Sequence, residues 1–474
     1  MLKRNDQIEI EILRYGSNGE GIGVCDGQTV FVPYTIAGEK VKAHIIFVKK
    51  NFAIGRATEI ITPSKERKQP LCPLFSKCGG CTMQHIGYQN QLEIKKGDVV
   101  QTFSKVAGLN LENLSVQGSP NEFGYRNKLS VPFSVDKNGK TICGFYRSGT
   151  HDIIEMENCP LQTDAGNTVF QIIKEFVSEY NIAGYKVERG KKSGLLRHAV
   201  IRAVKEGVIV VLVVNGGKVP FTDVLYARLQ KAVGVVSLYI NVNKEDTNVI
   251  FGDKFIHKCG PKAIEAEKSG IKFQVGAQSF LQVNDQVVDM LYGEGVEYLD
   301  AKENDVVVNC YSGAGFLSGM IAKSAKQVIG IEIVDEATTL ADQLAKENGF
   351  ETAMKNITGD VEVEFPKIVA ETQKQGKEVL LVLDPPRKGV DFSTLELIKK
   401  QSPKKVVYIS CNPQTLSRDV GILVGSLVWQ EVDGKKLLKK AENSKPQYKI
   451  TKNKCFDMFP QTNHVESVVC LELV

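Results

Sequence analysis

The sequence has no apolar run long enough to cross a lipid bilayer. The longest runs, such as Val208 to Val214 and Val379 to Leu383, stop far short of the roughly 20 residues that a membrane-spanning helix needs. The amino terminus also has no apolar stretch followed by a small-residue cleavage site, the pattern typical of a secretory signal. These absences lead us to expect a cytoplasmic protein that does not contact a membrane.

Internal repeats are also absent, and the composition excludes disordered and fibrous proteins. Apolar residues make up 42% of the chain and charged residues 24%, which is typical of a globular protein. The 474 residues are too many for one hydrophobic core, because domains average roughly 150 residues. We expect three domains in a monomer.

The formal net charge of +5 says little by itself, but basic residues are concentrated in two stretches. Residues 42–70 hold seven Lys and Arg against two acidic residues, and residues 431–454 hold eight against three. Each stretch could be a solvated loop face. Together, flanking a possible active site, they favour a nucleic-acid partner.

The chain has eleven cysteines, which in a reducing compartment do not indicate a disulfide framework. Cys72, Cys78 and Cys81 lie within ten residues, and Cys159, which precedes Pro160, is the best-placed fourth. Zinc sites usually show paired short spacings, whereas three cysteines plus a distant fourth favour an iron–sulfur cluster. Buried structural thiols that bind nothing are the alternative.

The pattern of predicted strands and helices divides the chain into regions. Residues 7–61 read as short strands with glycine turns, which predicts a small β-barrel. The charged segment 63–70, bounded by prolines, reads as a linker, and a helix is expected near residues 88–107. Between residues 129 and 251 strands predominate around a helix near 162–180, which indicates an α+β domain.

From about residue 271 strands and helices alternate regularly, which predicts a parallel, doubly wound α/β sheet. Strands are expected at 306–311, 327–331, 379–384 and 405–410. Such sheets bind ligands at the carboxyl ends of their strands. Candidate functional residues should therefore follow these strands.

A glycine-rich turn follows the first of these strands. Gly313 and Gly315 permit a tight turn, but Ser318 stands where a dinucleotide-binding turn needs a third glycine, so NAD is disfavoured. Glu332 closes the next strand, where a carboxylate can bind two ribose hydroxyls. A glycine turn followed by a carboxylate suits S-adenosylmethionine, although many α/β folds show both features for packing reasons alone.

Two further strand ends carry reactive side chains. Asp384 ends a buried strand at the same edge, before two prolines. Cys411 precedes Asn412 and Pro413, which are typical of the beginning of a helix, so we expect the helix dipole to favour the Cys411 thiolate. The alternative is that this cysteine is a small buried apolar side chain.

A thiolate beside a methyl donor predicts a specific reaction. Uracil C5 becomes nucleophilic when a thiolate adds to C6, and a base must later remove the C5 proton so that the thiolate can leave. His464 and Glu466 are the candidate bases. Since a free histidine would be partly protonated at neutral pH and a glutamate would be ionised, we favour Glu466.

In these motifs the chain resembles S-adenosylmethionine-dependent RNA uracil-5-methyltransferases, and the resemblance extends over nearly its whole length. Residues 1–63 resemble a TRAM domain, an OB-like RNA-binding barrel. The segments beginning at Gly144 and Gly194 resemble the family's central domain, and Ser279-Phe-Leu-Gln-Val-Asn resembles the opening of its methyltransferase domain.

The resemblance implies a role for each matching residue. In the ribosomal branch, four cysteines hold a [4Fe–4S] cluster, here matched by Cys72, Cys78, Cys81 and Cys159. Cofactor contacts are implied for Gln282, Tyr311, Glu332 and Asp384, around the turn of Gly313 and Gly315. Cys411 would be the nucleophile and Glu466 the base. The chain departs from the family in having Asn309 for aspartate and Ser312 for cysteine.

The sequence therefore predicts a three-domain enzyme that methylates C5 of a uridine in structured RNA. The expected domains are a barrel at 1–63, a central α+β domain with the cluster at 70–270, and a doubly wound, Rossmann-like methyltransferase domain at 271–474, on which the helix at 88–107 could pack. The expected substrate is 23S ribosomal RNA. A transfer-RNA methyltransferase, or a non-catalytic RNA-binding protein with a redox-sensing cluster, is the alternative.

Overall fold

The computed structural model describes residues 2–188, 190–432, 435–441 and 446–474. The chain forms two compact units, each assembled from separate segments. Unit 1 comprises residues 1–94, 121–264 and 459–463, and unit 2 comprises residues 95–120, 265–458 and 464–474. Among the described residues, no helix is both long and apolar enough to pass through a lipid bilayer.

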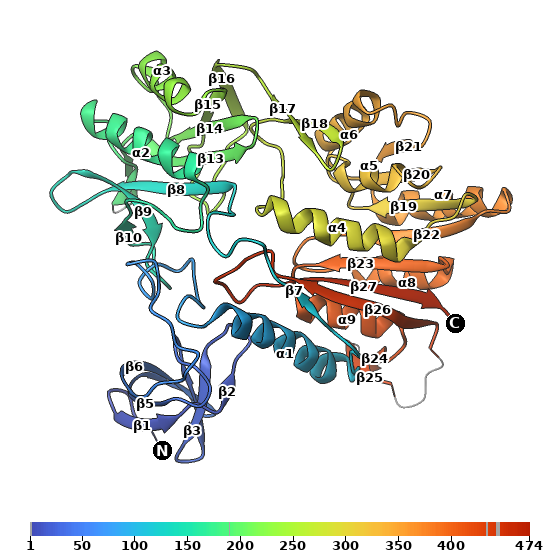
Figure 1. Ribbon diagram of the computed structural model, residues 1–474, viewed down its shortest axis with the longest axis horizontal. Helices are drawn as coiled ribbons and strands as arrows, with labels where there is room; N and C mark the ends of the chain where they lie inside the picture. The colour runs from blue at the N-terminus through green and yellow to red at the C-terminus, as the bar shows by residue number, and fades with distance from the viewer. Residues whose placement is uncertain (1, 189, 433–434, 442–445) are drawn as a thin grey trace. The chain divides into compact units, whose positions relative to one another are not determined.

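Unit 1 begins with a six-stranded barrel (Figure 1). Its strands are β1 (Gln7–Glu11), β2 (Arg14–Tyr15), β3 (Gly21–Cys25), β4 (Gln28–Val32), β5 (Lys40–Val48) and β6 (Phe52–Thr62), in the order β1-β5-β6-β4-β3-β2. Because β1 pairs with β5 and β2 pairs with β3, the nearly continuous segment of β1 and β2 joins both edges and closes the sheet. The predicted barrel is confirmed.

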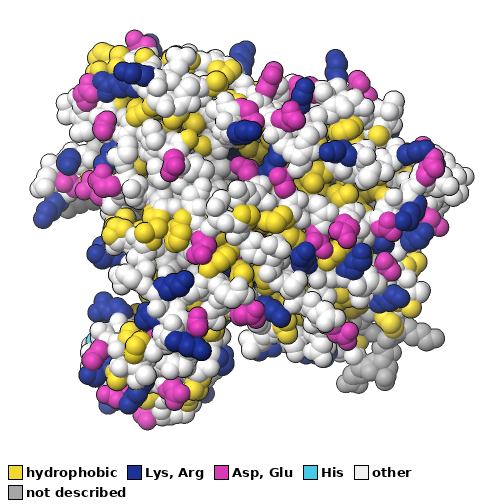
Figure 2. Space-filling model, viewed as in Figure 1, with side chains coloured by type: hydrophobic (Ala, Val, Ile, Leu, Met, Phe, Trp, Pro, Cys, Tyr) yellow, Lys and Arg dark blue, Asp and Glu magenta, His cyan; other side chains and the backbone are white. Residues whose placement is uncertain are grey.

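The surface of the barrel carries charges of both signs, as Figure 2 shows. Within the first predicted basic stretch, Lys42 forms an ion pair with Glu59 at 2.7 Å. The second stretch includes residues 433–434 and 442–445, which lie outside the described residues. Net charge alone therefore overstates how much positive surface the first stretch offers.

The rest of unit 1 is a seven-stranded sheet in the order β10-β9-β8-β13-β14-β15-β16. Its elements are β8 (Lys128–Val135), β9 (Thr141–Tyr146), β10 (Ile153–Glu155), β13 (Leu196–Val204), β14 (Gly207–Val214), β15 (Val236–Val242), β16 (Lys254–Cys259), α2 (Asp164–Glu179) and α3 (Thr222–Val233). The ribbon of β11 (Lys186–Glu188) and β12 (Lys191–Ser193) is separate.

Apolar side chains of α2 and α3 share one core with this sheet, and the barrel has a core of its own. On that basis we propose that the barrel and the central region are separate domains within unit 1. The boundaries 1–63 and 70–270 are part of this proposal.

Unit 2 is built on an eight-stranded sheet in the order β21-β20-β19-β22-β23-β27-β26-β7. Its strands are β7 (Val116–Gln117), β19 (Asp305–Cys310), β20 (Val328–Glu332), β21 (Met354–Thr358), β22 (Glu378–Leu383), β23 (Lys405–Ser410), β26 (Tyr448–Phe456) and β27 (Glu466–Leu473). The strands from β21 to β23 are parallel, whereas β27 runs antiparallel between β23 and β26. The predicted doubly wound α/β fold is confirmed.

Helices cover both faces of this sheet (Figure 1). They are α1 (Tyr88–Ala107), α4 (Asp285–Leu299), α5 (Phe316–Ala322), α6 (Asp335–Glu347), α7 (Val361–Lys374), α8 (Phe392–Gln401) and α9 (Pro413–Leu423). Side chains of α1, α7, α8 and α9 share the main core with the sheet. Two ribbons complete the unit's description: β17 (Ile264–Lys268) with β18 (Ile271–Val275), and β24 (Leu427–Val432) with β25 (Lys435–Lys440).

The helix predicted at residues 88–107 matches α1, and its carboxyl-terminal part belongs to unit 2. Val99 and Phe103 of α1 are buried in the core of the eight-stranded sheet. Lys95 of α1 forms a fully buried ion pair with Asp457, with 2.5 Å between Nζ and Oδ1. The segment 95–120 therefore contributes to the core of unit 2, although it precedes the rest of that unit by more than a hundred residues.

Candidate active site

The proposed site residues of unit 2 follow neighbouring strands at one edge of the sheet. Tyr311, Glu332, Asp384 and Cys411 lie at the carboxyl ends of parallel strands. Glu466 opens β27 and reaches the same edge because this strand runs in the opposite direction. The single strand reversal thus adds a carboxyl group that no parallel strand supplies.

The register between β23 and β27 brings the candidate nucleophile and base together. Ser410 pairs with Ser467, so the next positions outward are Cys411 and Glu466. Their electrostatic interaction raises the pKa of the Cys411 thiol. These two residues are 55 positions apart in the printed sequence, and only the sheet pairing makes them neighbours.

The glycine turn after β19 adopts a strained, tightly packed backbone. Tyr311, Gly313 and Gly315 have φ angles of 63°, 54° and 84°, respectively. A Cβ atom on Gly315 would lie 2.7 Å from the Ala341 Cβ. A side chain at position 315 would therefore displace α6, which explains why glycine is required there.

Glu332 is oriented by backbone N–H groups of its surroundings. Gly313 donates to Oε2 and Val334 donates to Oε1, both at 2.9 Å. Each carboxylate oxygen retains a second lone pair. The side chain is thus held in place and still able to accept hydrogen bonds from two hydroxyl groups.

The two departures from the family pattern, Asn309 and Ser312, fit the structure around them. The Asn309 side chain is buried and donates to Ser318 Oγ at 2.9 Å. An aspartate at position 309 would place a charge in this buried site, whereas the amide is neutral. The backbone N–H of Ser312 donates to the Ile331 carbonyl, which its side chain does not affect.

Asp384 lies in a hydrogen-bonded group with two residues of the preceding segment. The Tyr292 hydroxyl donates to Asp384 Oδ2 at 3.1 Å, and the Gln282 side chain also bonds to Tyr292. Burial raises the pKa of the half-buried Asp384 to about 6, with the Tyr292 hydrogen bond opposing. Tyr292 was not predicted, because its spacing on α4 is that of an ordinary core residue.

The expectation of a readily ionised Cys411 is wrong for this structure. Asn412 caps α9 by accepting from the Gln414 N–H at 3.0 Å, as predicted. Burial nevertheless raises the pKa of the Cys411 thiol, and the carboxylates of Glu466 and Asp384 raise it further. Arg387 and a local backbone hydrogen bond lower it by less, so the unliganded site favours the protonated thiol.

Glu466 is almost fully buried, whereas His464 is exposed. Burial raises the pKa of Glu466 well above its usual range, Asp384 raises it further, and Arg387 opposes the shift. The expectation that this glutamate would be ionised because of its reference pKa is therefore wrong. Arg387, which no sequence motif singled out, acts on both Cys411 and Glu466.

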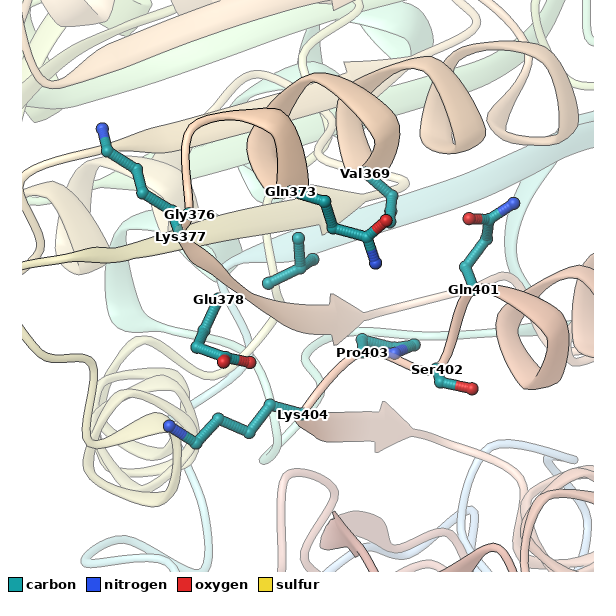
Figure 3. Close-up of a pocket in the computed structure, with 10 residues that line it drawn as sticks. Val369, Gln373, Gly376, Lys377, Glu378, Gln401, Ser402, Pro403 and Lys404 are labelled. Carbon is teal, nitrogen blue, oxygen red and sulfur yellow. The ribbon is translucent and has the colours of Figure 1, made fainter.

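A separate pocket, drawn in Figure 3, lies at the opposite edge of the sheet. Its lining includes Glu378, which begins β22, and Lys404, which precedes β23. The candidate residues Asp384 and Cys411 follow these same strands. The pocket is therefore separated from the candidate site by the length of the strands.

The four candidate cluster cysteines lie in unit 1 and are close to one another. Burial raises the pKa of Cys81 to about 12, with Gln84 opposing and the thiols of Cys159, Cys78 and Cys72 adding to the rise. No three His, Cys, Asp or Glu side chains in the described part of the chain are placed to hold a metal ion. The predicted cluster is therefore not shown, although its four thiols interact electrostatically.

Comparison with known families identifies the two recognisable regions. A model described as tRNA (Uracil-5-)-methyltransferase matches residues 226–474, and a TRAM domain model matches residues 2–58. The chain belongs to the tRNA (uracil-5-)-methyltransferase family. It is an RNA methyltransferase with an amino-terminal TRAM domain.

Similar proteins span the whole chain. An uncharacterized RNA methyltransferase of Clostridium acetobutylicum is 38% identical over 479 residues, covering 100% of this chain and 98% of its own length. A Listeria monocytogenes protein of the same description is 37% identical, covering 100% and 99%. A Pyrococcus abyssi tRNA (uracil-54, C5)-methyltransferase, solved with S-adenosyl-L-homocysteine, has a TM-score of 0.73 at 23% identity and covers 98% and 99%. This last likeness shows that the fold is shared.

Proposed function

We propose that this enzyme methylates C5 of a uridine in structured RNA, with Cys411 as the nucleophile and Glu466 as the base. The observation that carries the proposal is the register of β23 and β27, which makes these two residues neighbours at the edge where ligands of doubly wound sheets bind. A thiol beside a buried carboxyl group is what addition to C6 and removal of the C5 proton require.

The chemistry follows from the positions of the two residues. The Cys411 thiolate adds to C6 of uracil, which makes C5 nucleophilic, and S-adenosylmethionine supplies the methyl group that C5 takes. The Glu466 carboxylate then accepts the proton from C5. The electrons of the broken C–H bond restore the C5–C6 double bond as the C6–Sγ bond breaks, so Cys411 leaves as a thiolate.

We propose Gln282, Tyr311, Gly313, Gly315, Glu332 and Asp384 as the residues that bind the cofactor. The raised pKa values of Asp384, Cys411 and Glu466 support a site in which the Arg387 cation does not outweigh burial and the neighbouring acids before the cofactor binds. A cationic sulfur at this edge would lower the pKa of all three groups. Cofactor binding and activation of the thiol would then be coupled.

A trapping experiment tests the assignment of Cys411. RNA with 5-fluorouridine at the target should remain covalently attached to the enzyme, because fluorine cannot leave as a proton. Mass spectrometry should place the adduct on Cys411, and Cys411→Ala should abolish both the adduct and methylation. Cys259→Ala, at another half-buried cysteine, is the matched control and should retain both. An adduct on any other residue would contradict the proposal.

For the RNA substrate we propose 23S ribosomal RNA, with transfer RNA as a second candidate. The four-cysteine pattern supports ribosomal RNA, through the resemblance to the ribosomal branch. The name of the matching family supports transfer RNA. The barrel does not discriminate, because the Pyrococcus protein, titled a tRNA methyltransferase, covers 98% of this chain. Mapping 5-methyluridine in both RNAs from a deletion strain would decide between them.

We also propose that Cys72, Cys78, Cys81 and Cys159 hold a [4Fe–4S] cluster. A cluster of four irons separates its thiolates further than a single ion does. The support from the structure is that the thiols of Cys72, Cys78, Cys81 and Cys159 lie close enough to interact electrostatically. Backbone contacts support the loops: Cys72 N–H donates to Gln84 Oε1 at 3.0 Å, and Cys159 N–H to Asn167 Oδ1 at 2.9 Å.

Anaerobic purification tests the cluster. The protein should be brown, with iron and sulfide in near-equal amounts, and Cys78→Ser should lose both. Cys25→Ser, in the barrel strand β3, should keep both. Stoichiometric zinc in a colourless sample would contradict the proposal. Because the cysteines lie in unit 1 and the methyl transfer moves no electron to a metal, we expect the cluster to support structure or RNA binding.

A further inference from the structure

The loop between β22 and α8 is exposed at Arg387 and Lys388, yet side chains of α9 hold its backbone. Asn412 Nδ2 donates to the Arg387 carbonyl at 3.0 Å, and Thr415 Oγ1 donates to the same oxygen at 3.3 Å. Arg418 Nη2 donates to the Lys388 carbonyl at 3.1 Å. The helix that begins just after Cys411 therefore fixes the course of this loop.

A fully buried carboxylate strengthens the same connection. Asp419 Oδ2 accepts hydrogen bonds from the Tyr408 hydroxyl at 2.6 Å and from the Val390 N–H at 2.9 Å, while its Oδ1 accepts from Arg418 Nε at 2.7 Å. Gly389 has a φ of 77°, and a Cβ atom there would lie 2.6 Å from Asp419 Oδ2. Glycine thus lets the loop backbone approach the carboxylate.

The Arg387 side chain shows what the loop presents to the site. Its guanidinium makes no hydrogen bond or ion pair within the described part of the chain, and it is exposed. Its charge acts on Cys411 and on Glu466. The carboxyl groups of Glu466 and Asp384 act on Cys411 in the opposite direction. The Arg387 cation thus offsets two acids beside the thiol.

We propose that Arg418 and Asp419 are positioning residues that hold the Arg387 loop against α9, so that the Arg387 guanidinium stays beside the nucleophile and the base. The inference deepens the proposed function, since it rests on Cys411 and Glu466 as the reacting groups. Asp419 fixes the orientation of Arg418, and Arg418 fixes the loop. Neither residue is required to touch substrate.

The test measures the reactivity of Cys411 in the full-length protein without RNA. Iodoacetamide labelling of the Cys411 peptide is followed by mass spectrometry as a function of pH, which reports the fraction of thiolate. Arg387→Gln should shift the curve to higher pH, with labelling at pH 7.5 slowed roughly threefold or more, since threefold corresponds to half a pKa unit. Lys388→Gln, which removes the neighbouring exposed cation, is the matched control and should not shift the curve.

The positioning role predicts that the effects of the variants are not additive. Arg418→Gln should shift the curve in the same direction as Arg387→Gln, and the double variant should match Arg387→Gln alone. Should Arg418→Gln fail to fold, Thr415→Val removes one hydrogen bond to the loop without touching Asp419, and the same comparison applies. The positioning role would be overturned if the labelling curves of the single variants matched that of the wild type, or if the shifts of the single variants added in the double variant. Either result would leave the 5-fluorouridine test of Cys411 unaffected.

Discussion

Replacing Asp384 with asparagine should stabilise unit 2 while it abolishes or severely slows methylation. Burial raises the Asp384 pKa from 3.8 to about 6. An acid whose folded pKa is raised contributes stability below its unfolded pKa and loses it as pH rises through the folded pKa. Above pH 6 the ionised Asp384 therefore opposes folding, and Asp384→Asn removes that cost while the amide oxygen can still accept from Tyr292.

The size of the effect follows from the shift. Two pKa units correspond to about 3 kcal/mol at full ionisation, and partial solvent exposure of Asp384 reduces this, so we expect about 1–3 kcal/mol at pH 8. Near pH 4.5, where the folded-state carboxyl is mostly protonated, the gain should fall to about 1 kcal/mol or less. For a unit of this size, each kcal/mol corresponds to roughly 2–4 °C in Tm.

Thermal unfolding at the two pH values is the assay. Asp384→Asn should raise Tm by roughly 2–12 °C at pH 8 and by clearly less at pH 4.5. Glu378→Gln removes an exposed carboxylate at the other end of β22 and should change Tm little at either pH. An equal gain at both pH values would mean that packing is the cause, and no gain at pH 8 would refute the reasoning.

Three further outcomes follow from the site and from the core of unit 2. Glu466→Gln should slow release of the methylated adduct by roughly 10²–10⁴-fold, so that the covalent protein–RNA adduct survives denaturing electrophoresis. His464→Gln should still release methylated RNA. If the His464 variant retained the adduct and the Glu466 variant released it, the roles of the two residues would be exchanged. Because Cys411 and Glu466 must both lose a proton and both have raised pKa values, initial rates should rise from pH 6 to pH 9, and a fall over this range would contradict the assignment. Lys95→Met removes the cation that is paired with the buried Asp457 carboxylate and should cost about 3–5 kcal/mol in urea unfolding. Asp457→Leu in the same chain should restore most of this loss, and an unchanged single variant would show that the pair is not buried in solution.

The sequence was informative where position along a strand determines function. Alternation of strands and helices placed Glu332, Asp384 and Cys411 after parallel strands, and the structure has the same strands. The sequence alone could not predict that β27 pairs antiparallel with β23, because a pairing between distant segments depends on the whole sheet. Glu466 was favoured over His464 only by its reference pKa and by the resemblance to the family, since the pairing that brings Glu466 to Cys411 could not be predicted.

The ionisation state of the site was beyond sequence reasoning for a related cause. Asn412 and Pro413 correctly predicted the beginning of α9, and from that a reactive thiolate was expected. The pKa of Cys411 is nevertheless raised, because burial and two carboxyl groups brought from other strands outweigh the local helix. Similarly, Arg387 looks like an ordinary loop residue until its backbone contacts with α9 are known.

The composition of unit 2 from segments 95–120, 265–458 and 464–474 has a consequence for how the protein is made. During synthesis at about 5–20 residues per second, α1 leaves the ribosome before the sheet that will bury it exists. Cys411 follows, and Glu466 arrives only with β27, the strand that must insert between two strands already made. A chain interrupted before that point has the proposed nucleophile but lacks the proposed base, so on the proposed mechanism it would bind RNA covalently and not release it. On that mechanism, synthesis of β27 is a condition for turnover.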